Sequence, residues 1–174
     1  FLMSVIETIA VIFSILYVIL ATKEKIWCWL CAGISVSLYI YICYSAKLYL
    51  ETGLQVFYLI MAIYGYWQWN KPKKKITIGT WSLQCHLLIF GVGIIASFLL
   101  GKLLEIYTDA ALPIIDSLTT IFSLFATYMV TKKILENWIY WIVIDIVSVY
   151  LYYIRDLQLT AGLFAAYTII AVFG

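Results

Sequence analysis

Stretches of about 20 mostly apolar residues recur along the whole 174-residue chain, and they constrain its fold more than any other feature. A helix needs about 20 apolar residues to cross the hydrocarbon core of a bilayer. Charged residues make up 11% of the chain, whereas roughly a quarter is typical of soluble domains. Such a small number of charges does not coat a water-facing surface. The sequence therefore predicts an integral membrane protein.

We count seven of these apolar stretches, separated by polar connectors that are too short to fold separately. They cover residues 5–22, 26–44, 50–69, 81–100, 111–130, 137–154 and 157–174. Each is long enough for one membrane-spanning helix. We therefore expect an all-α membrane protein in which residues 1–174 form a single domain.

Lysines and arginines are distributed unevenly among the connectors. With seven crossings, the connectors after the first, third and fifth stretches share one side and hold eight positive charges, against three on the other side. The eight are Lys23, Lys25, Lys71, Lys73, Lys74, Lys75, Lys132 and Lys133. Because positive residues in short loops tend to stay cytoplasmic, we expect the N-terminus outside and the C-terminus in the cytoplasm.

The two ends of the chain superimpose without a gap when one is shifted by 109 residues. The shift aligns identical residues at helix ends and small-residue positions as well as at apolar ones, for example Ser14 with Ser123, Trp29 with Trp138, Tyr41 with Tyr150 and Gly53 with Gly162. An internal repeat of this kind is one of the known transporter plans. We predict two parallel three-helix repeats, 5–69 and 111–174, joined by a linker helix over 81–100. The repeat also predicts a short basic tail after Gly174, and a start at Phe1 suggests missing N-terminal residues.

Asp145 is a carboxylate in the middle of the apolar stretch 137–154. An ionisable group at this depth costs about 3 kcal/mol on insertion scales, so it is a functional candidate by default. The other acidic residues near the stretches lie close to helix ends, where water reaches them. Val36 is its counterpart in the first repeat. This asymmetry suits ligand binding better than symmetric packing.

Several polar or aromatic side chains share the predicted helix face of Asp145, because residues three, four and seven apart lie on one side of a helix. They are Trp138, Trp141, Ser148 and Tyr152. A flat cationic ligand would suit this stripe. In the first repeat, Ser35 and Tyr39 share a helix face, and Gln55 follows on the third stretch. The alternative interpretation is that Trp and Tyr fill helix interfaces while Ser and Gln form interhelical hydrogen bonds.

Other classes of function find no support in the sequence. The net charge of +2 and one short basic run, 71–75, do not make a nucleic-acid-binding face. A lone histidine, His86, and the pair Cys28 and Cys31 lack the partners of a zinc site. There is no phosphate-binding loop, serine nucleophile motif or second deep carboxylate. We therefore expect no enzyme activity, no metal and no cofactor, with His86 and the cysteines in structural roles.

Two runs of residues resemble the PnuC family of bacterial vitamin transporters. The first is Leu54-Gln55-Val56-Phe57-Tyr58 followed by Ile63-Tyr64-Gly65-Tyr66-Trp67-Gln68-Trp69, and the second is Glu136-Asn137-Trp138 with Trp141 and Asp145. The resemblance implies a SWEET-like 3+1+3 arrangement, a homotrimer and a place in the bacterial cytoplasmic (inner) membrane. It also implies facilitated uptake of nicotinamide riboside, with thiamine carried by relatives, and trapping of the vitamin by cytoplasmic phosphorylation.

The resemblance also assigns site residues. It implies that Gln55 is the substrate glutamine and that Trp138 or Trp141 is the site tryptophan, whereas the two site asparagines of the family are replaced by Ser35 and Asp145. A carboxylate over an aromatic floor suits the pyridinium of nicotinamide riboside or the thiazolium of thiamine. The remaining polar contacts would come from Tyr39 and Tyr150. A membrane scaffold that transports nothing is the rival from another class.

Overall fold

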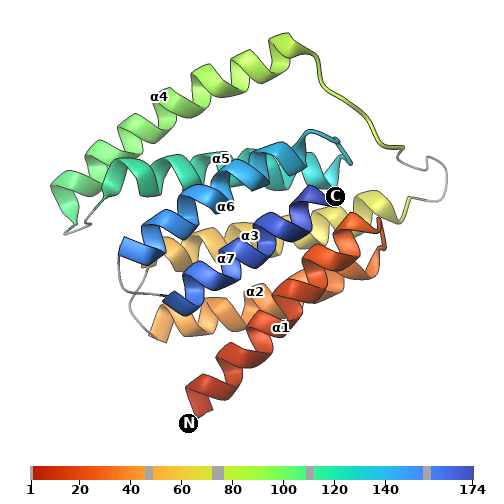
Figure 1. Cartoon of the computed structure of the whole chain (residues 1–174), viewed down its shortest axis with the longest axis horizontal. Helices are drawn as coiled ribbons and strands as arrows, with labels where there is room; N and C mark the ends of the chain where they lie inside the picture. Colours follow the sequence, from red (N-terminus) through yellow and green to blue (C-terminus); the bar gives the residue numbers. More distant parts are fainter. Residues whose placement is uncertain (1, 46–48, 72–76, 109–111, 155–157) are drawn as a thin grey trace. The chain divides into compact units, whose positions relative to one another are not determined.

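The computed structural model describes residues 2–45, 49–71, 77–108, 112–154 and 158–174, and most of them are helical (Figure 1). These ranges contain α1 (Leu2–Thr22), α2 (Trp27–Ser45), α3 (Tyr49–Trp69), α4 (Leu83–Tyr107), α5 (Pro113–Thr131), α6 (Asn137–Ile154) and α7 (Gln158–Val172). Each helix overlaps one of the seven predicted apolar stretches. The predicted all-α fold is therefore confirmed.

Four of the described helices are long and apolar enough to cross a membrane. These are α1 from Val5 onward, α2, α4 and α5, whereas the apolar parts of α6 and α7 are shorter, Asn137–Leu151 and Ala161–Val172. Over its 21 residues, α3 includes Glu51, Gln55 and Gln68, which lower its mean hydropathy. Length and composition thus support a multi-pass membrane protein, and a polar third helix is a reason to look for function there.

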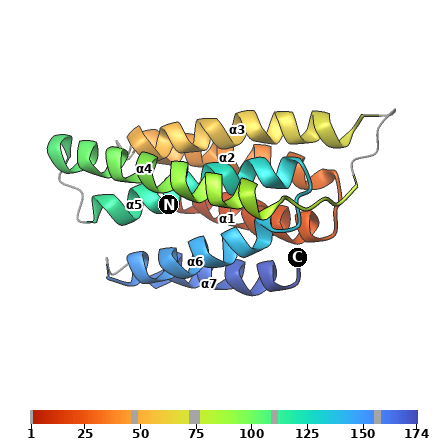
Figure 2. The same ribbon diagram turned by 90° about the horizontal axis from the view of Figure 1, so that it is seen from above.

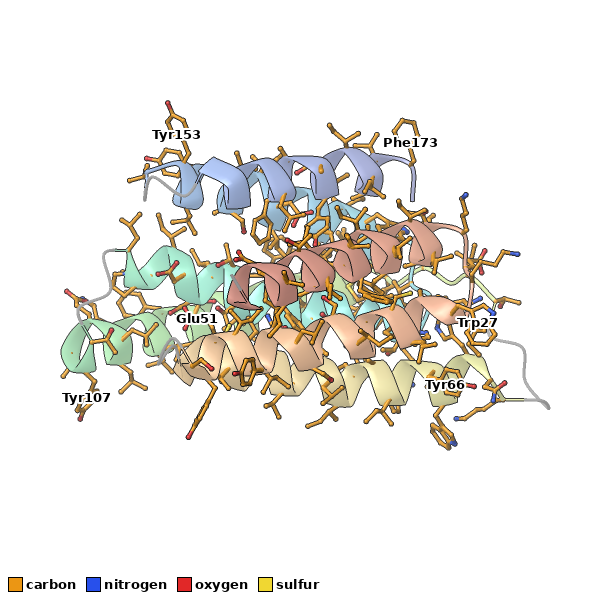
Figure 3. The ribbon with its side chains drawn as sticks, turned by 90° about the horizontal axis from the view of Figure 1, so that it is seen from below. Trp27, Glu51, Tyr66, Tyr107, Tyr153 and Phe173 are labelled. Carbon is orange, nitrogen blue, oxygen red and sulfur yellow. The ribbon has the colours of Figure 1, made fainter. Side chains whose placement is uncertain are left out.

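Large aromatic side chains lie exposed at the ends of several helices. Figure 3 shows Tyr66, Tyr107, Tyr153 and Phe173 pointing away from the ribbon, and Trp27 and Trp67 are exposed at helix ends too. Aromatic side chains of this kind are enriched at the two interfaces between membrane and water. Their positions agree with helices that end near the lipid headgroups.

The fourth helix is longer than predicted. The sequence places its end at residue 100, but α4 continues to Tyr107. Lys102 Nζ lies 2.7 Å from Glu105 Oε2, one helical turn further on, and Thr108 N donates to Leu104 O. The drop in hydropathy at Lys102 marks the end of the apolar sequence and not the end of the helix. The predicted connector 101–110 is therefore wrong for residues 101–107.

The chain divides into two compact units, one with residues 1–77 and 169–174 and the other with residues 78–168. In the first unit, α2 packs against both α1 and α3 (Figure 2). Ser35 Oγ of α2 donates to Ala10 O of α1 at 2.9 Å. The indole of Trp29 lies against Gly65 of α3, where a Cβ atom would overlap the ring. The helices of this unit are thus held by one buried hydroxyl and by close aromatic packing.

In the second unit, α5 packs against both α4 and α6. Its core cluster comprises Ile89, Ala126, Met129, Ile134, Tyr140 and Ile144. Gly93 of α4 faces the ring of Phe122, and Gly101 faces the backbone of Ile114. The small residues of α4 therefore allow a close approach to α5, as expected for helices in a membrane.

The turn between α1 and α2 has the same backbone geometry as the turn between α5 and α6. Glu24 and Lys133, which are 109 residues apart, are the described non-glycine residues with positive φ, at 50° and 53°. Each follows the end of a helix in a Schellman motif, in which a left-handed residue lets two amides bond to the last carbonyls. The paired bonds are Lys25 N to Leu20 O and Glu24 N to Ala21 O in one turn, and Ile134 N to Met129 O and Lys133 N to Val130 O in the other.

Side chains at matched positions also behave alike. Thr22 Oγ1 donates to Ile19 O, and Thr131 Oγ1 donates to Tyr128 O. Tyr41 and Tyr150 are similarly exposed, at 54% and 58%. These likenesses agree with the expected repeat. The 3+1+3 arrangement and the repeat bounds, 5–69, 81–100 and 111–174, stay predictions, as does the single domain.

Candidate ligand-binding site on the sixth helix

One face of α6 is buried and the opposite face is exposed. The buried face holds Asn137, Tyr140, Ile144, Asp145, Ser148 and Leu151, and the exposed face holds Ile139, Val143, Ile146, Tyr150 and Tyr153. Isoleucine and valine supply the whole exposed face apart from the two tyrosines near its end, which is the composition that contact with lipid requires. Apart from these two tyrosines, the exposed face carries no polar side chain among the described residues, whereas Asn137, Asp145 and Ser148 point into the protein.

Asp145 lies on the buried face in the middle of α6, with 3% of its surface exposed. Among the residues whose burial the structure describes, it is the one buried carboxylate. The ion pairs of the described residues are His86 with Glu136 and Lys102 with Glu105, so Asp145 belongs to neither. A buried acid that is not neutralised by a fixed lysine or arginine is suited to pairing with a cation that comes and goes.

The predicted stripe around Asp145 is present on α6. Trp138 and Trp141 are half-buried and Ser148 is buried, on the face that Asp145 occupies. Trp141 packs against the core cluster of the second unit, which restricts the movement of its ring. The side chain of Tyr152 lies outside the described part of the chain. Two indoles and a carboxylate within two helical turns offer a cation both charge pairing and cation-π contact.

The candidate residues of the first unit have different surroundings. Ser35 is 2% exposed, and its hydroxyl bonds to Ala10 O and to Ser14 Oγ. Tyr39 lies one turn further along α2 and is half-buried. Gln55 is half-buried on α3. Their membership of the ligand site stays a prediction, because they lie in the first unit and Asp145 lies in the second.

Tyr150 does not share the face of Asp145. At 100° per residue the two positions are about 140° apart around the helix, and the phenol of Tyr150 is 58% exposed. Its repeat partner Tyr41 is exposed as well. We therefore leave Tyr150 out of the group proposed below.

Sequence reasoning did not single out Tyr140 and Asn137, two further buried polar residues of α6. Tyr140 Oη lies 2.9 Å from His86 Nδ1, and Asn137 Nδ2 donates to Ile134 O while its Oδ1 has no partner among the described residues. Spacing was an available signal for Asn137, which lies four residues before Trp141, whereas Tyr140 is not three or four residues from any candidate site residue on this helix. Both lie in the first turn of α6, next to Trp138 and Trp141.

Comparisons with known proteins agree with a membrane transporter fold. Two proteins named nicotinamide riboside transporter PnuC are similar to this chain. The one from Neisseria mucosa is 28% identical over 159 residues, which are 83% of this chain and 58% of that protein. The one from Escherichia coli K12 is 26% identical over 201 residues, 99% of this chain and 84% of that protein. The chain thus spans little more than half of the Neisseria relative.

A solved structure shares the fold. The crystal structure of the vitamin B3 transporter PnuC superimposes with a TM-score of 0.78 at 24% identity, and the match covers 98% of this chain and 78% of that one. A family model described as nicotinamide mononucleotide transporter matches residues 4–174. This range contains all seven described helices except the first two residues of α1. With nearly its whole length matched, the chain belongs to the nicotinamide mononucleotide transporter family.

Proposed function

We propose that the chain is a membrane facilitator that takes up a cationic B-vitamin precursor, and that nicotinamide riboside is its substrate. The observation that carries this proposal is the buried Asp145 beside Trp138 and Trp141 on one face of α6. Family membership supports the reaction class, and the names of the relatives support the vitamin. The carboxylate would hold the pyridinium charge, and the indoles would hold the ring.

The proposed site also includes residues of the first unit. Gln55, Ser35 and Tyr39 would supply hydrogen bonds to the amide and the ribose. Transport would follow alternating access, in which bundles rock around a central site. Phosphorylation in the cytoplasm would then trap the vitamin, so the chain itself needs no enzyme activity and no cofactor.

We further propose a homotrimer in the bacterial cytoplasmic membrane, with the N-terminus outside and the C-terminus in the cytoplasm. The orientation is supported by the eight positive charges on one side against three on the other. The mass of the purified protein in lipid nanodiscs tests the trimer, and a monomeric mass would exclude it.

Thiamine is the second candidate substrate. It is favoured by the acidic character of Asp145, because a carboxylate pairs with any flat cation and does not recognise the carboxamide of nicotinamide. Proteoliposomes loaded with buffer, and given labelled nicotinamide riboside, separate the two. We expect excess unlabelled nicotinamide riboside to suppress uptake and excess thiamine to leave it unchanged, whereas stronger suppression by thiamine would make thiamine the substrate.

Replacing the carboxylate tests the site directly. We expect Asp145→Asn to weaken nicotinamide riboside binding about tenfold to a hundredfold, the size of effect that one charged hydrogen bond supplies. The matched control is Glu105→Gln, which removes an exposed carboxylate of α4 paired with Lys102 and should leave affinity unchanged. Unchanged affinity of Asp145→Asn would remove this residue from the mechanism, while tighter binding would point to another native substrate.

The same measurements address the rival function, a membrane scaffold that transports nothing. A scaffold predicts no uptake above that of empty liposomes and no saturable binding of either vitamin. Saturable uptake that Asp145→Asn abolishes would exclude it.

A further inference from the structure

A cluster of polar side chains lies between the first turn of α4 and the first turns of α6, apart from the stripe of Asp145. His86 Nδ1 lies 2.9 Å from Tyr140 Oη, and His86 Nε2 lies 3.9 Å from Glu136 Oε1. Glu136 directly precedes α6, and Tyr140 lies four residues later in the first turn of that helix. Both nitrogens of the single imidazole therefore face oxygen atoms at the start of α6.

The cluster is largely shielded from solvent. The side chains of His86 and Glu136 are 17% and 23% exposed, and Tyr140 is buried. The ring of Trp81 lies 6.2 Å from the imidazole, and the rings of Phe90 and Phe122 pack on Tyr140. His86 Nε2 and Glu136 Oε2 have no hydrogen-bond partner among the described residues. Leaving two buried polar atoms without hydrogen-bond partners costs free energy, so these two atoms need an explanation.

The geometry selects one neutral form of the imidazole. If Nε2 carries the proton, it faces the Glu136 carboxylate favourably while Nδ1 accepts from the Tyr140 hydroxyl. If Nδ1 carries the proton instead, the lone pair of Nε2 faces the carboxylate, which is unfavourable. When both nitrogens are protonated, Nδ1 donates to Tyr140 and Nε2 pairs with Glu136. Protonation thus reverses the hydrogen bond to Tyr140 and tightens the contact with Glu136.

Backbone hydrogen bonds also join the segment before α4 to the segment before α6. Gly79, just before α4, accepts from Leu135 N at 2.9 Å and donates to Lys133 O at 3.0 Å. These bonds fix the backbone of the turn that leads into α6. His86 contacts Glu136, which directly precedes α6, and Tyr140 in the first turn of α6, so these contacts resist a rotation of the helix about its own axis.

We propose that His86 is a positioning residue that, through Tyr140 and Glu136, sets how α6 presents Trp138, Trp141 and Asp145 to the ligand. Trp141 follows Tyr140 directly, and Trp138 lies between Glu136 and Tyr140. A rotation of α6 that breaks the His86 contacts would therefore move both indoles. Protonation of His86 would therefore change this position, because it reverses the hydrogen bond to Tyr140.

Other charged or titratable groups around the cluster are few. On α4 the neighbour is Cys85, and on α5 it is Tyr128, whose ring packs on Trp81 at 6.3 Å. Lys132 Nζ lies 5.5 Å from the Tyr128 ring, and the backbone of Lys133 is engaged by Gly79. Among the described side chains, Glu136 is therefore the one acidic group placed to respond to the charge on His86.

The chain contains one histidine, so imidazole nitrogen signals of the untagged, ¹⁵N-histidine-labelled protein in nanodiscs all come from His86. We expect the neutral imidazole to carry its proton on Nε2, and we expect Glu136→Gln to mix the two neutral forms, because it removes the carboxylate that the lone pair of Nε2 would otherwise face. A wild-type imidazole that already interconverts between both forms, as in water, would overturn the proposal. This measurement needs no ligand, so it stands even if the proposed substrate is wrong.

The second measurement rests on the proposed function. We expect the ratio of the nicotinamide riboside Kd at pH 5.5 to that at pH 8 to change about threefold to tenfold in His86→Gln, in line with the loss of one hydrogen bond. Tyr140→Phe should change this ratio in wild-type protein and have no further effect in the His86→Gln background. Tyr153→Phe, the same change at an exposed position of α6, is the control and should keep the wild-type ratio.

A merely structural histidine gives a different result. In that case His86→Gln and Tyr140→Phe would lower the unfolding temperature yet keep the wild-type Kd ratio between the two pH values, and the proposal would be wrong. Tyr140→Phe preserves the ring that packs on Phe90 and Phe122, so it keeps the test available if His86→Gln does not fold. Failure of the wild type to bind the vitamin would refute the proposed function and leave the imidazole measurement to decide the role of His86.

Discussion

Ser35 and Asp145 are both buried polar residues within helices, and they differ in what their side chains bond to. The Ser35 hydroxyl donates to Ala10 O and lies 2.7 Å from Ser14 Oγ, so it joins α2 to α1 without any ligand. Asp145 belongs to neither ion pair of the described residues. The serine therefore has a structural role already in the free protein, and the carboxylate has the stronger claim to the ligand.

Replacing Ser35 measures that structural role. We expect Ser35→Ala to lower the free energy of unfolding by about 1 kcal/mol, because it leaves Ala10 O without its buried donor. Ser37→Ala is the control, since the exposed Ser37 hydroxyl bonds to Gly33 O of its own helix, and it should stay within about 0.5 kcal/mol of wild type. Thermal unfolding in detergent gives both values. A vitamin Kd that rises while stability is unchanged would instead support a direct contact with the substrate.

At this scale the sequence was informative where a residue contrasts with its surroundings. Asp145 could be found because an ionisable side chain in an apolar helix costs free energy in the membrane and therefore marks a functional candidate. Tyr150 could not be placed, because matching it to Tyr41 gives its depth in the repeat and not the face of the helix on which it lies. The His86–Tyr140 contact joins residues 54 positions apart, and the helical spacing of neighbouring residues cannot predict a contact between such distant positions.

The distance between packed helices depends on the size of the side chains at their contact. On α4, Gly93 and Gly101 face α5, whereas a Cβ atom at Gly91 would meet nothing within 4 Å. The sequence predicted the existence of every helix, because apolar length alone reports it. It misplaced the end of α4, because helical hydrogen bonds continue through Lys102 and Glu105 after hydropathy has dropped.

Gly101 offers a sharp test of this packing. A Cβ atom at Gly101 would lie 2.9 Å from Ile114 Cα, and a backbone atom cannot move aside as a side chain can. We expect Gly101→Ala to destabilise the protein by about 1–3 kcal/mol, the usual cost of overpacking. Gly91→Ala on the same helix should be neutral or slightly stabilising. Equal unfolding temperatures for the two variants in detergent would contradict the close approach of α4 and α5.

The two left-handed turns make a prediction about elements as well. Glu24 and Lys133 adopt a conformation that glycine reaches without strain. We expect Glu24→Gly and Lys133→Gly each to raise stability by up to about 1 kcal/mol, and Lys133→Val to lower it, because a branched Cβ suits this region worst. Chemical unfolding curves measure the effect. Loss of stability in both glycine variants would mean that the native side chains make contacts that outweigh the backbone strain.

For the whole molecule, the uneven distribution of positive charge determines the expected orientation in the membrane. Membrane composition and helix number could be predicted from the sequence because both depend on local hydropathy. How the two units face each other depends on contacts between distant residues, and apolar stretches that resemble one another do not specify those contacts.

Cysteine labelling tests the orientation in cells. In a background without the four native cysteines, we expect Lys25→Cys to react with a membrane-impermeant thiol reagent from the cytoplasmic side and Lys102→Cys to react from the outside. Both positions are exposed, and each loses one of the eleven positive charges. Reaction of both from the same side would contradict an odd number of crossings between them, and the reverse pattern would invert the topology.

A lone buried carboxylate also has an electrical consequence. If Asp145 is ionised when no vitamin is bound, the empty carrier reorients with a net negative site, and the carrier loaded with a monovalent cation reorients with a neutral one. Moving one elementary charge through the full membrane potential involves about 2.3 kcal/mol per 100 mV. Voltage would then act on the return of the empty carrier and not on the step that moves the vitamin.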